Sequence, residues 1–174
     1  AGRLGRKSGE GFYDYREGVT RAQPTEISSR AAVATCVVEG HLGAANALLA
    51  RLREHDIEVI QRDGQGLLRV GDAVLALSDG RMACQRARED GLDNLILLDL
   101  ALDYRQASRI AISCCADIHP AALEHGVALL QRAGFSVSQL SDSPALAVLR
   151  TVAMLANEAA DAVLQGVASA ADVD

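Results

Sequence analysis

Aromatic residues are scarce in this 174-residue chain. They make up 3% of the sequence and tryptophan is absent, so a hydrophobic core has to be built from alanine, leucine, valine and isoleucine. The hydrophobic fraction of 49% is large enough for such a core. Small aliphatic residues in this proportion are typical of helices packed on a parallel sheet.

The chain also lacks an excess of positive charge. Its formal net charge is -6, which argues against a nucleic-acid partner because phosphate binding requires a basic surface. No run approaches the roughly 18 apolar residues of a membrane span, and the first residues lack the apolar stretch of a secretion signal. We therefore expect a cytoplasmic protein without membrane partners. The missing initiator methionine and the ending SAADVD, which resembles the start of a helix, lead us to expect a fragment of a longer protein.

Signatures of metal binding and of catalysis are missing as well. The four cysteines are Cys36, Cys84, Cys114 and Cys115, and none has the CxxC spacing of a metal site. We expect all four to be buried free thiols, with adjacent Cys114 and Cys115 on opposite faces of a strand. The sequence contains no nucleophile elbow, Walker loop or HExxH motif. It therefore predicts no metal site and no catalytic residue in this chain.

The sequence does contain apolar patterns typical of strands and of helices, and the two kinds alternate along the chain. Residues 1–30 contain five glycines and read as an arm that ends in a linker. Beyond them, we expect strands at 31–40, 57–63, 70–80, 94–102, 109–117 and 135–142, and helices at 43–56, 81–91, 119–134 and 144–166. This alternation predicts an α/β fold: a reduced Rossmann-like parallel sheet with flanking helices, preceded by an N-terminal arm and followed by a long C-terminal helix.

The first strand and helix are joined by a turn that resembles a dinucleotide-binding fingerprint. The fingerprint GxGxxG places pyrophosphate on the backbone of the turn. Here Gly40 matches the first glycine and Ala45 is an accepted substitute for the third, but Leu42 replaces the second glycine. We expect the Leu42 side chain to fill the space that a phosphate needs. The turn is therefore predicted to be degenerate and to bind no nucleotide.

Other polar residues are candidates for weaker reasons. Asp99, Asp103 and Asp117 follow predicted strands, where open α/β sheets bind ligands, yet solvated loops explain them better. Arg150, Asn157 and Asp161 share one face of the long apolar helix. That face either contacts a substrate or a second subunit, or forms internal polar contacts between helices.

Two segments resemble the 3-hydroxyacyl-CoA dehydrogenases. GRLGRKSGEGFYDY (2–15), with glycines at 2, 5, 9 and 11 and with Arg6, Lys7, Phe12 and Tyr13, resembles the segment that closes the helical C-terminal domain of that family. LRTVAMLANEAADAVLQGVASAADVD (149–174), with NEA at 157–159 and with Gly166, resembles the start of a second such domain. The α/β zone between them is similar to the reduced Rossmann domain of the family's long form, which includes enzymes of 3-hydroxybutyryl-CoA and phenylacetate degradation.

This resemblance implies an organisation into four parts. They are the end of a first helical domain (1–20), a linker (21–30), a reduced Rossmann-like domain (31–143) and the start of a second helical domain (144–174). The family oxidises 3-hydroxyacyl-CoA to 3-ketoacyl-CoA with NAD, using a His–Glu pair in an N-terminal Rossmann domain that has no counterpart here. Leu149 departs from the family pattern, which has an active-site Asn directly before the Arg that Arg150 matches.

The resemblance therefore implies a C-terminal, non-catalytic region of such an enzyme. The parent would bind NAD and acyl-CoA, while this region would be inactive alone, hold no cofactor and form a homodimer through its helical part. Two alternatives are an oligomerisation or scaffold module without a small-molecule site, and a free-standing domain that binds acyl-CoA or a nucleotide.

Overall fold

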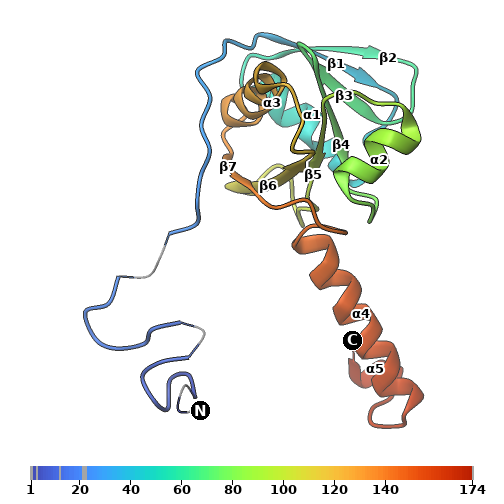
Figure 1. Cartoon of the computed structure of the whole chain (residues 1–174). Helices are drawn as coiled ribbons and strands as arrows, with labels where there is room; N and C mark the ends of the chain where they lie inside the picture. The colour runs from blue at the N-terminus through green and yellow to red at the C-terminus, as the bar shows by residue number, and fades with distance from the viewer. Residues whose placement is uncertain (1, 3, 12, 21–22, 174) are drawn as a thin grey trace.

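The computed structural model describes residues 2, 4–11, 13–20 and 23–173. Figure 1 shows three parts: an extended N-terminal arm, a sheet covered by helices, and a helix that projects away from the sheet toward the C-terminus. Phe12 of the family-like segment lies outside the described residues. Within those residues, every helix is too short or too polar to cross a membrane.

The sheet has seven strands in the order β2-β1-β3-β4-β5-β6-β7. Their bounds are β1 (Thr35–Glu39), β2 (Glu58–Arg62), β3 (Leu67–Val70), β4 (Ala73–Leu77), β5 (Leu95–Leu98), β6 (Arg109–Cys114) and β7 (Ser136–Gln139). The predicted α/β fold of the reduced Rossmann type is confirmed. Each predicted strand contains one of these strands, and β3 is additional.

The sheet is mixed, which corrects the expectation of a parallel one. The pairs β1–β2, β4–β5 and β6–β7 are parallel, whereas β1–β3, β3–β4 and β5–β6 are antiparallel. The connection lengths explain this difference. Only Gly71 and Asp72 separate β3 from β4, and parallel neighbours need a crossover of a dozen or more residues. The segment from β5 to β6 likewise contains no helix to carry the chain back.

Both faces of the sheet are covered by helices. Because side chains along a strand alternate between the two faces, one strand contributes residues to both cores. Ile96 and Leu98 of β5 belong to a large core with the helices α1 (Leu48–Glu54) and α3 (Pro120–Arg132). Leu95 and Leu97 belong to a smaller core on the other face, with α2 (Ala83–Asp90). Burial on both faces explains why these strands read as continuous apolar runs.

The N-terminal arm returns to the sheet at its edge strand. The backbone N–H of Ile27 donates to the carbonyl of Val137 in β7 at 2.9 Å. The Ser29 N–H donates to the Gln131 side chain of α3 at 2.9 Å, and Arg109 of β6 pairs with Glu26. These contacts place the predicted linker against β7, and they cover an edge that would otherwise offer unpaired backbone groups.

A buried arginine of α1 connects this helix to the end of α3 and to the loop between β5 and β6. The Arg51 side chain donates to the carbonyl oxygens of Ala133, Tyr104, Ala107 and Gly134 at 2.5–3.2 Å. Its guanidinium carbon also lies 3.6 Å from the ring centroid of Phe135. Burial lowers the pKa of Arg51. Since no carboxylate of the described residues hydrogen-bonds this guanidinium, carbonyl dipoles and the aromatic ring are its partners.

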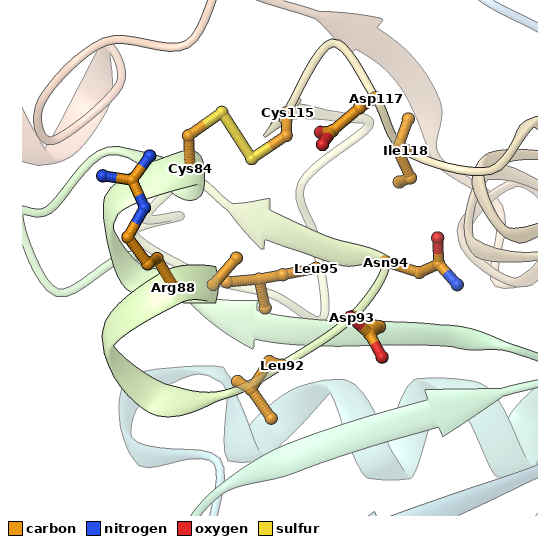
Figure 2. A pocket seen from close by; sticks show the side chains of 10 residues that line it. Cys84, Arg88, Leu92, Asp93, Asn94, Leu95, Cys115, Asp117 and Ile118 are labelled. Atoms are coloured by element: carbon orange, nitrogen blue, oxygen red, sulfur yellow. A yellow bond between two sulfur atoms is a disulfide. The ribbon is translucent and has the colours of Figure 1, made fainter.

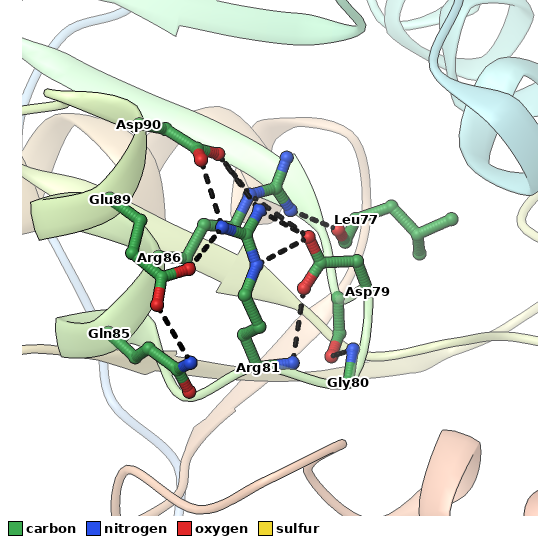
Figure 3. A network of polar contacts seen from close by, with 9 residues as sticks. Leu77, Asp79, Gly80, Arg81, Gln85, Arg86, Glu89 and Asp90 are labelled. Atoms are coloured by element: carbon green, nitrogen blue, oxygen red, sulfur yellow. Dashed lines mark hydrogen bonds and ion pairs between the residues drawn. The ribbon is translucent and has the colours of Figure 1, made fainter.

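Charged residues hold α2 to the strand before it (Figure 3). Arg81 forms ion pairs with Asp79 at 2.7 Å, Glu89 at 2.8 Å and Asp90 at 2.9 Å. Hydrogen bonds from Arg81 lower the pKa values of Glu89 and Asp90. The network ties the C-terminal end of α2 to the loop that follows β4.

Candidate functional site

The turn after β1 differs from a dinucleotide-binding turn in its geometry. Gly40 has a φ of 78°, and the chain then enters a 3₁₀-helix, η1 (Gly43–Ala47), before α1 begins. Leu42 is 5% exposed and packs in the large core, as does Ala45. The leucine side chain therefore points beneath the turn instead of filling the space above it, contrary to our expectation for Leu42.

The space above the turn is taken by another segment, the loop between β2 and β3. A Cβ atom on Gly40 would overlap the carbonyl oxygen of Gly64, and one on Gly66 would lie 2.7 Å from the carbonyl oxygen of His41. The Gly66 N–H donates to the Glu39 carbonyl at 2.6 Å. The backbone of this loop packs directly on the turn where a Rossmann domain holds pyrophosphate. A hollow beside this contact is lined by Gly40, Gln61, Arg62 and Asp63.

The long helix α4 (Val148–Leu164) begins on a buried aspartate of the sheet. Asp99, which is 1% exposed and follows β5, accepts hydrogen bonds from the backbone N–H groups of Ala147, Val148 and Leu149 at 2.8–3.2 Å. It also accepts from its neighbour Leu100 at 2.8 Å. Asp99 is thus a helix cap supplied from a distant part of the chain, not the solvated loop residue that the sequence suggested.

The three candidate residues on α4 lie at different distances from the sheet. Arg150 is in the first turn and donates to the Pro144 carbonyl through Nε at 3.1 Å and Nη2 at 2.5 Å. Asn157 and Asp161 lie farther along the helix and are exposed. The structure therefore brings neither Asn157 nor Asp161 to the sheet. Leu149, the departure from the family pattern, is half-buried beside Asp99.

The apolar side chains of α4 are largely uncovered in this chain. No residue of α4 or of α5 (Ala170–Val173) is buried. An apolar groove runs between the two helices, lined by Ala159, Ala160, Val163, Leu164, Ala170 and Val173. Leu164 is 84% exposed. Contiguous exposed apolar surface is typical of interaction sites.

A polar cavity lies on the α2 side of the sheet (Figure 2). It has a volume of about 500 Å³ and is lined by residues of α2, of the segment leading into β5 and of the loop after β6. A disulfide between Cys84 and Cys115 lies along it, and Arg88, Asp93 and Asp117 contribute charge. The expectation that all four cysteines are free thiols is therefore wrong for two of them. Cys84 and Cys115 are 31 positions apart in the sequence, so no short spacing motif indicated that they pair.

Beside this disulfide lies Asp142, whose carboxylate caps α2. It accepts the backbone N–H groups of Ala83 at 2.7 Å and Cys84 at 2.9 Å, and the Ser113 hydroxyl at 3.0 Å. One oxygen of Asp142 and the two cysteine sulfurs all lie within 4.8 Å of one another. This cluster, which sequence spacing did not reveal, contains metal-ligand types, although the sulfurs are bonded to each other.

The mixed sheet, the covered faces and the blocked turn define a Rossmann-like domain of reduced form. Residues 75–144 match the model of the 3-hydroxybutyryl-CoA dehydrogenase reduced Rossmann-fold domain. The predicted similarity to the 3-hydroxyacyl-CoA dehydrogenases is therefore confirmed, and residues 75–144 are the part of the chain that resembles the reduced Rossmann-fold domain of that family.

Whole-chain comparisons agree with the domain match. The 3-hydroxyadipyl-CoA dehydrogenase of Escherichia coli K12 is 29% identical over 178 residues, which cover 99% of this chain and 30% of that protein. The crystal structure of 3-hydroxybutyryl-CoA dehydrogenase from Escherichia coli K12 has a TM-score of 0.68 and 27% identity, over 97% of this chain and 30% of its own. The chain thus spans about a third of the length of these relatives.

A more distant structure shares the fold alone. It is a crystal structure of an NAD⁺-dependent dismutase, a 5-dehydrogenase of 5-formyl-3-hydroxy-2-methylpyridine 4-carboxylic acid. Its TM-score is 0.56 at 15% identity, over 82% of this chain and 69% of its own. This likeness covers most of both chains, so the arrangement of sheet and helices is not peculiar to the two similar relatives.

Proposed function

We propose that this chain is the C-terminal, non-catalytic region of an NAD-dependent 3-hydroxyacyl-CoA dehydrogenase. The parent enzyme oxidises a 3-hydroxyacyl-CoA to the 3-ketoacyl-CoA, in fatty-acid or phenylacetate degradation. Its NAD and its acyl-CoA bind outside the residues of this chain. The region described here supports the packing and the assembly of the enzyme and is inactive alone.

The observation that carries this proposal is the contact between the loop 64–66 and the turn at 40–41. A hydride-transferring Rossmann domain needs an open turn for the pyrophosphate of NAD. In this chain the carbonyl oxygen of Gly64 and the backbone of Gly66 lie against that turn. The domain keeps the Rossmann-like sheet and lacks the feature that makes such a sheet bind a dinucleotide.

The helical part supplies the assembly function in this proposal. Val152, Leu155 and Leu164 of α4 are 40–84% exposed, and burying apolar area contributes roughly 25 cal/mol per Å². A second copy that covers this face would form a homodimer, with Asn157 and Asp161 as polar contacts at its rim. Asp99 would fix the interface relative to the sheet, because it caps the helix that carries these residues.

An activity assay tests the catalytic side of the proposal. The purified chain is supplied with NAD⁺ and 3-hydroxybutyryl-CoA, and the absorbance of reduced nicotinamide is followed. We expect no turnover, with the Escherichia coli 3-hydroxyadipyl-CoA dehydrogenase as the active control. Turnover by the 174-residue chain, retained after rigorous repurification, would contradict the proposal.

Light scattering tests the assembly side, which the second candidate, an oligomerisation or scaffold module unrelated to dehydrogenation, also requires. We expect a dimer at low micromolar concentration that dissociates when Leu155, 65% exposed, is changed to Glu. The control Leu102→Glu alters a side chain that is 92% exposed and lies outside α4, and it should leave the dimer intact. A monomeric wild-type chain would contradict both the homodimer and the scaffold alternative.

A further inference from the structure

The Cys84–Cys115 disulfide joins two elements that are far apart in the sequence. Cys84 is the second residue of α2, and Cys115 is the residue that follows β6. Their Cα atoms are 5.0 Å apart and their sequence separation is 31 residues. The bond therefore ties the start of a helix to the loop that leads from the sheet into α3.

The disulfide is open to the cavity beside it. Both cysteines are half-buried and both line the cavity of about 500 Å³ shown in Figure 2. The other two cysteines are shielded, since Cys36 is 1% and Cys114 is 7% exposed. Access therefore separates the four thiols into an approachable pair and a protected pair.

Hydrogen bonds hold the two cysteines in position without help from the disulfide. Asp142 accepts the N–H groups of Ala83 and Cys84 in α2 and the hydroxyl of Ser113 in β6. These bonds involve no sulfur atom, so they persist when the disulfide is reduced. Two thiols held beside each other in this way re-form their bond at a high effective concentration.

The charges around the cavity fit small peptide thiols. Arg88 lies one turn along α2 from Cys84, and Asp93 and Asp117 line the same cavity. A tripeptide thiol such as glutathione carries carboxylates for the arginine and an ammonium group for the aspartates. The lining thus offers charged partners of both signs in the cavity along which the disulfide lies.

We propose that Cys84 and Cys115 form a reversible thiol–disulfide exchange site for low-molecular-weight thiols and disulfides. In the oxidising direction, the thiolate of one cysteine attacks a sulfur of a small disulfide, forms a mixed disulfide and releases one small thiol. The second cysteine thiolate then attacks the protein sulfur of the mixed disulfide and releases the second small thiol. Two electrons and two protons pass from the protein dithiol to the small disulfide, and reduction is the reverse.

The proposal is independent of whether the parent is a dehydrogenase, because it concerns the state of α2 alone. Oxidation closes a loop that runs from α2 through β5 and β6. Closing a loop of this length raises the thermal midpoint of a chain of this size by roughly 10 °C. Thiols at the site would thereby adjust how firmly α2 is attached to the sheet.

Equilibration with glutathione tests the exchange. The full chain is incubated in buffers with different ratios of reduced to oxidised glutathione, quenched with acid and alkylated, and its free thiols are counted by mass spectrometry. We expect one transition between four free thiols and two, with Cys84 and Cys115 as the pair that changes. Cys84→Ser and Cys115→Ser should each retain one glutathione as a mixed disulfide on the remaining cysteine, whereas Cys36→Ala should keep the transition.

Other results would overturn the proposal. One is a wild-type chain that accumulates mixed disulfides at both positions without forming the internal bond. Another is a reduced chain that binds one Zn²⁺, in a titration with the metal alone, and loses that binding in Cys84→Ser and in Asp142→Asn. The cluster would then be a metal site. Equal thermal midpoints for the oxidised and reduced chains would also contradict it.

Discussion

The attachment of α4 to the sheet depends on one buried side chain, and this leads to a quantitative prediction for Asp99→Asn. One carboxylate oxygen accepts the N–H groups of Ala147 and Val148, and the other accepts those of Leu100 and Leu149. The amide of asparagine has almost the same shape but only one acceptor oxygen. Whichever oxygen is replaced, two backbone donors face an NH₂ group and lose their partner.

The magnitude follows from the exposure of the groups that lose their bonds. A hydrogen bond to a charged group contributes about 1.5–3 kcal/mol, and water at the exposed start of α4 recovers part of it, leaving a net loss of about 1 kcal/mol for each donor. The total of about 2 kcal/mol corresponds to a roughly 30-fold larger opening equilibrium. Because α4 buries no residue, this opening is confined to the helix and does not unfold the sheet.

Hydrogen exchange measured by mass spectrometry detects this opening. Amides of α4 in Asp99→Asn should exchange roughly 30-fold faster than in the wild type, while those of β5 change little. The control is Asp103→Asn, an exposed position whose carboxylate accepts the N–H of Arg105 at 2.8 Å, which the asparagine side-chain oxygen can also do. Protection of α4 that is the same in the two variants would refute the assignment of Asp99 as its cap.

Three further predictions concern the sheet domain. Arg51→Met should destabilise the chain by about 3 kcal/mol in urea because it leaves buried carbonyls without donors; a loss below about 1 kcal/mol would contradict that role. Gly40→Ala should lower the melting temperature well beyond Gly80→Ala, since both glycines have positive φ but only Gly40 meets a neighbouring backbone; equal losses would mean that the loop is not seated on the turn. Arg81 lowers the pKa of Asp90. The ion pair between them therefore adds stability at pH values above the ordinary aspartate pKa near 4. This stability is lost as the pH falls through the lower pKa that Asp90 has in the folded chain. Arg81→Gln should therefore flatten the decline in unfolding free energy below about pH 4, and an unchanged slope would contradict this.

Local patterns predicted most elements of the fold but not the direction of every strand. Continuous apolar runs such as Leu95–Leu98 revealed the buried strands, because burial on both faces removes the polar alternation. The hairpin at Gly71 and Asp72 was missed since the preceding strand, Leu67–Val70, is only four residues long and its pattern merged with the next. That short strand, together with the helix-free connection before β6, makes the sheet mixed.

The candidate site was harder to predict because its contacts join distant parts of the chain. The degenerate fingerprint drew attention to the turn at Gly40, but the sequence could not show that Leu42 points into the core or that Gly64 lies on the turn. Asp99 caps α4 through the N–H of Val148, 49 positions away, and Asp142 caps α2 through the N–H of Ala83, 59 positions away. No local spacing encodes such partners, and the same holds for Cys84 and Cys115.

Titration of NADH into the purified chain tests the central claim most directly, namely that the Rossmann-like sheet has lost its nucleotide site. Calorimetry and nicotinamide fluorescence are measured in parallel, with the NAD⁺-dependent 5-dehydrogenase of similar fold as the positive control. We predict no binding at high micromolar NADH, because the loop at Gly64 and Gly66 lies on the turn. Clear one-to-one binding would mean that the turn still accepts pyrophosphate, and it would contradict the account of this domain.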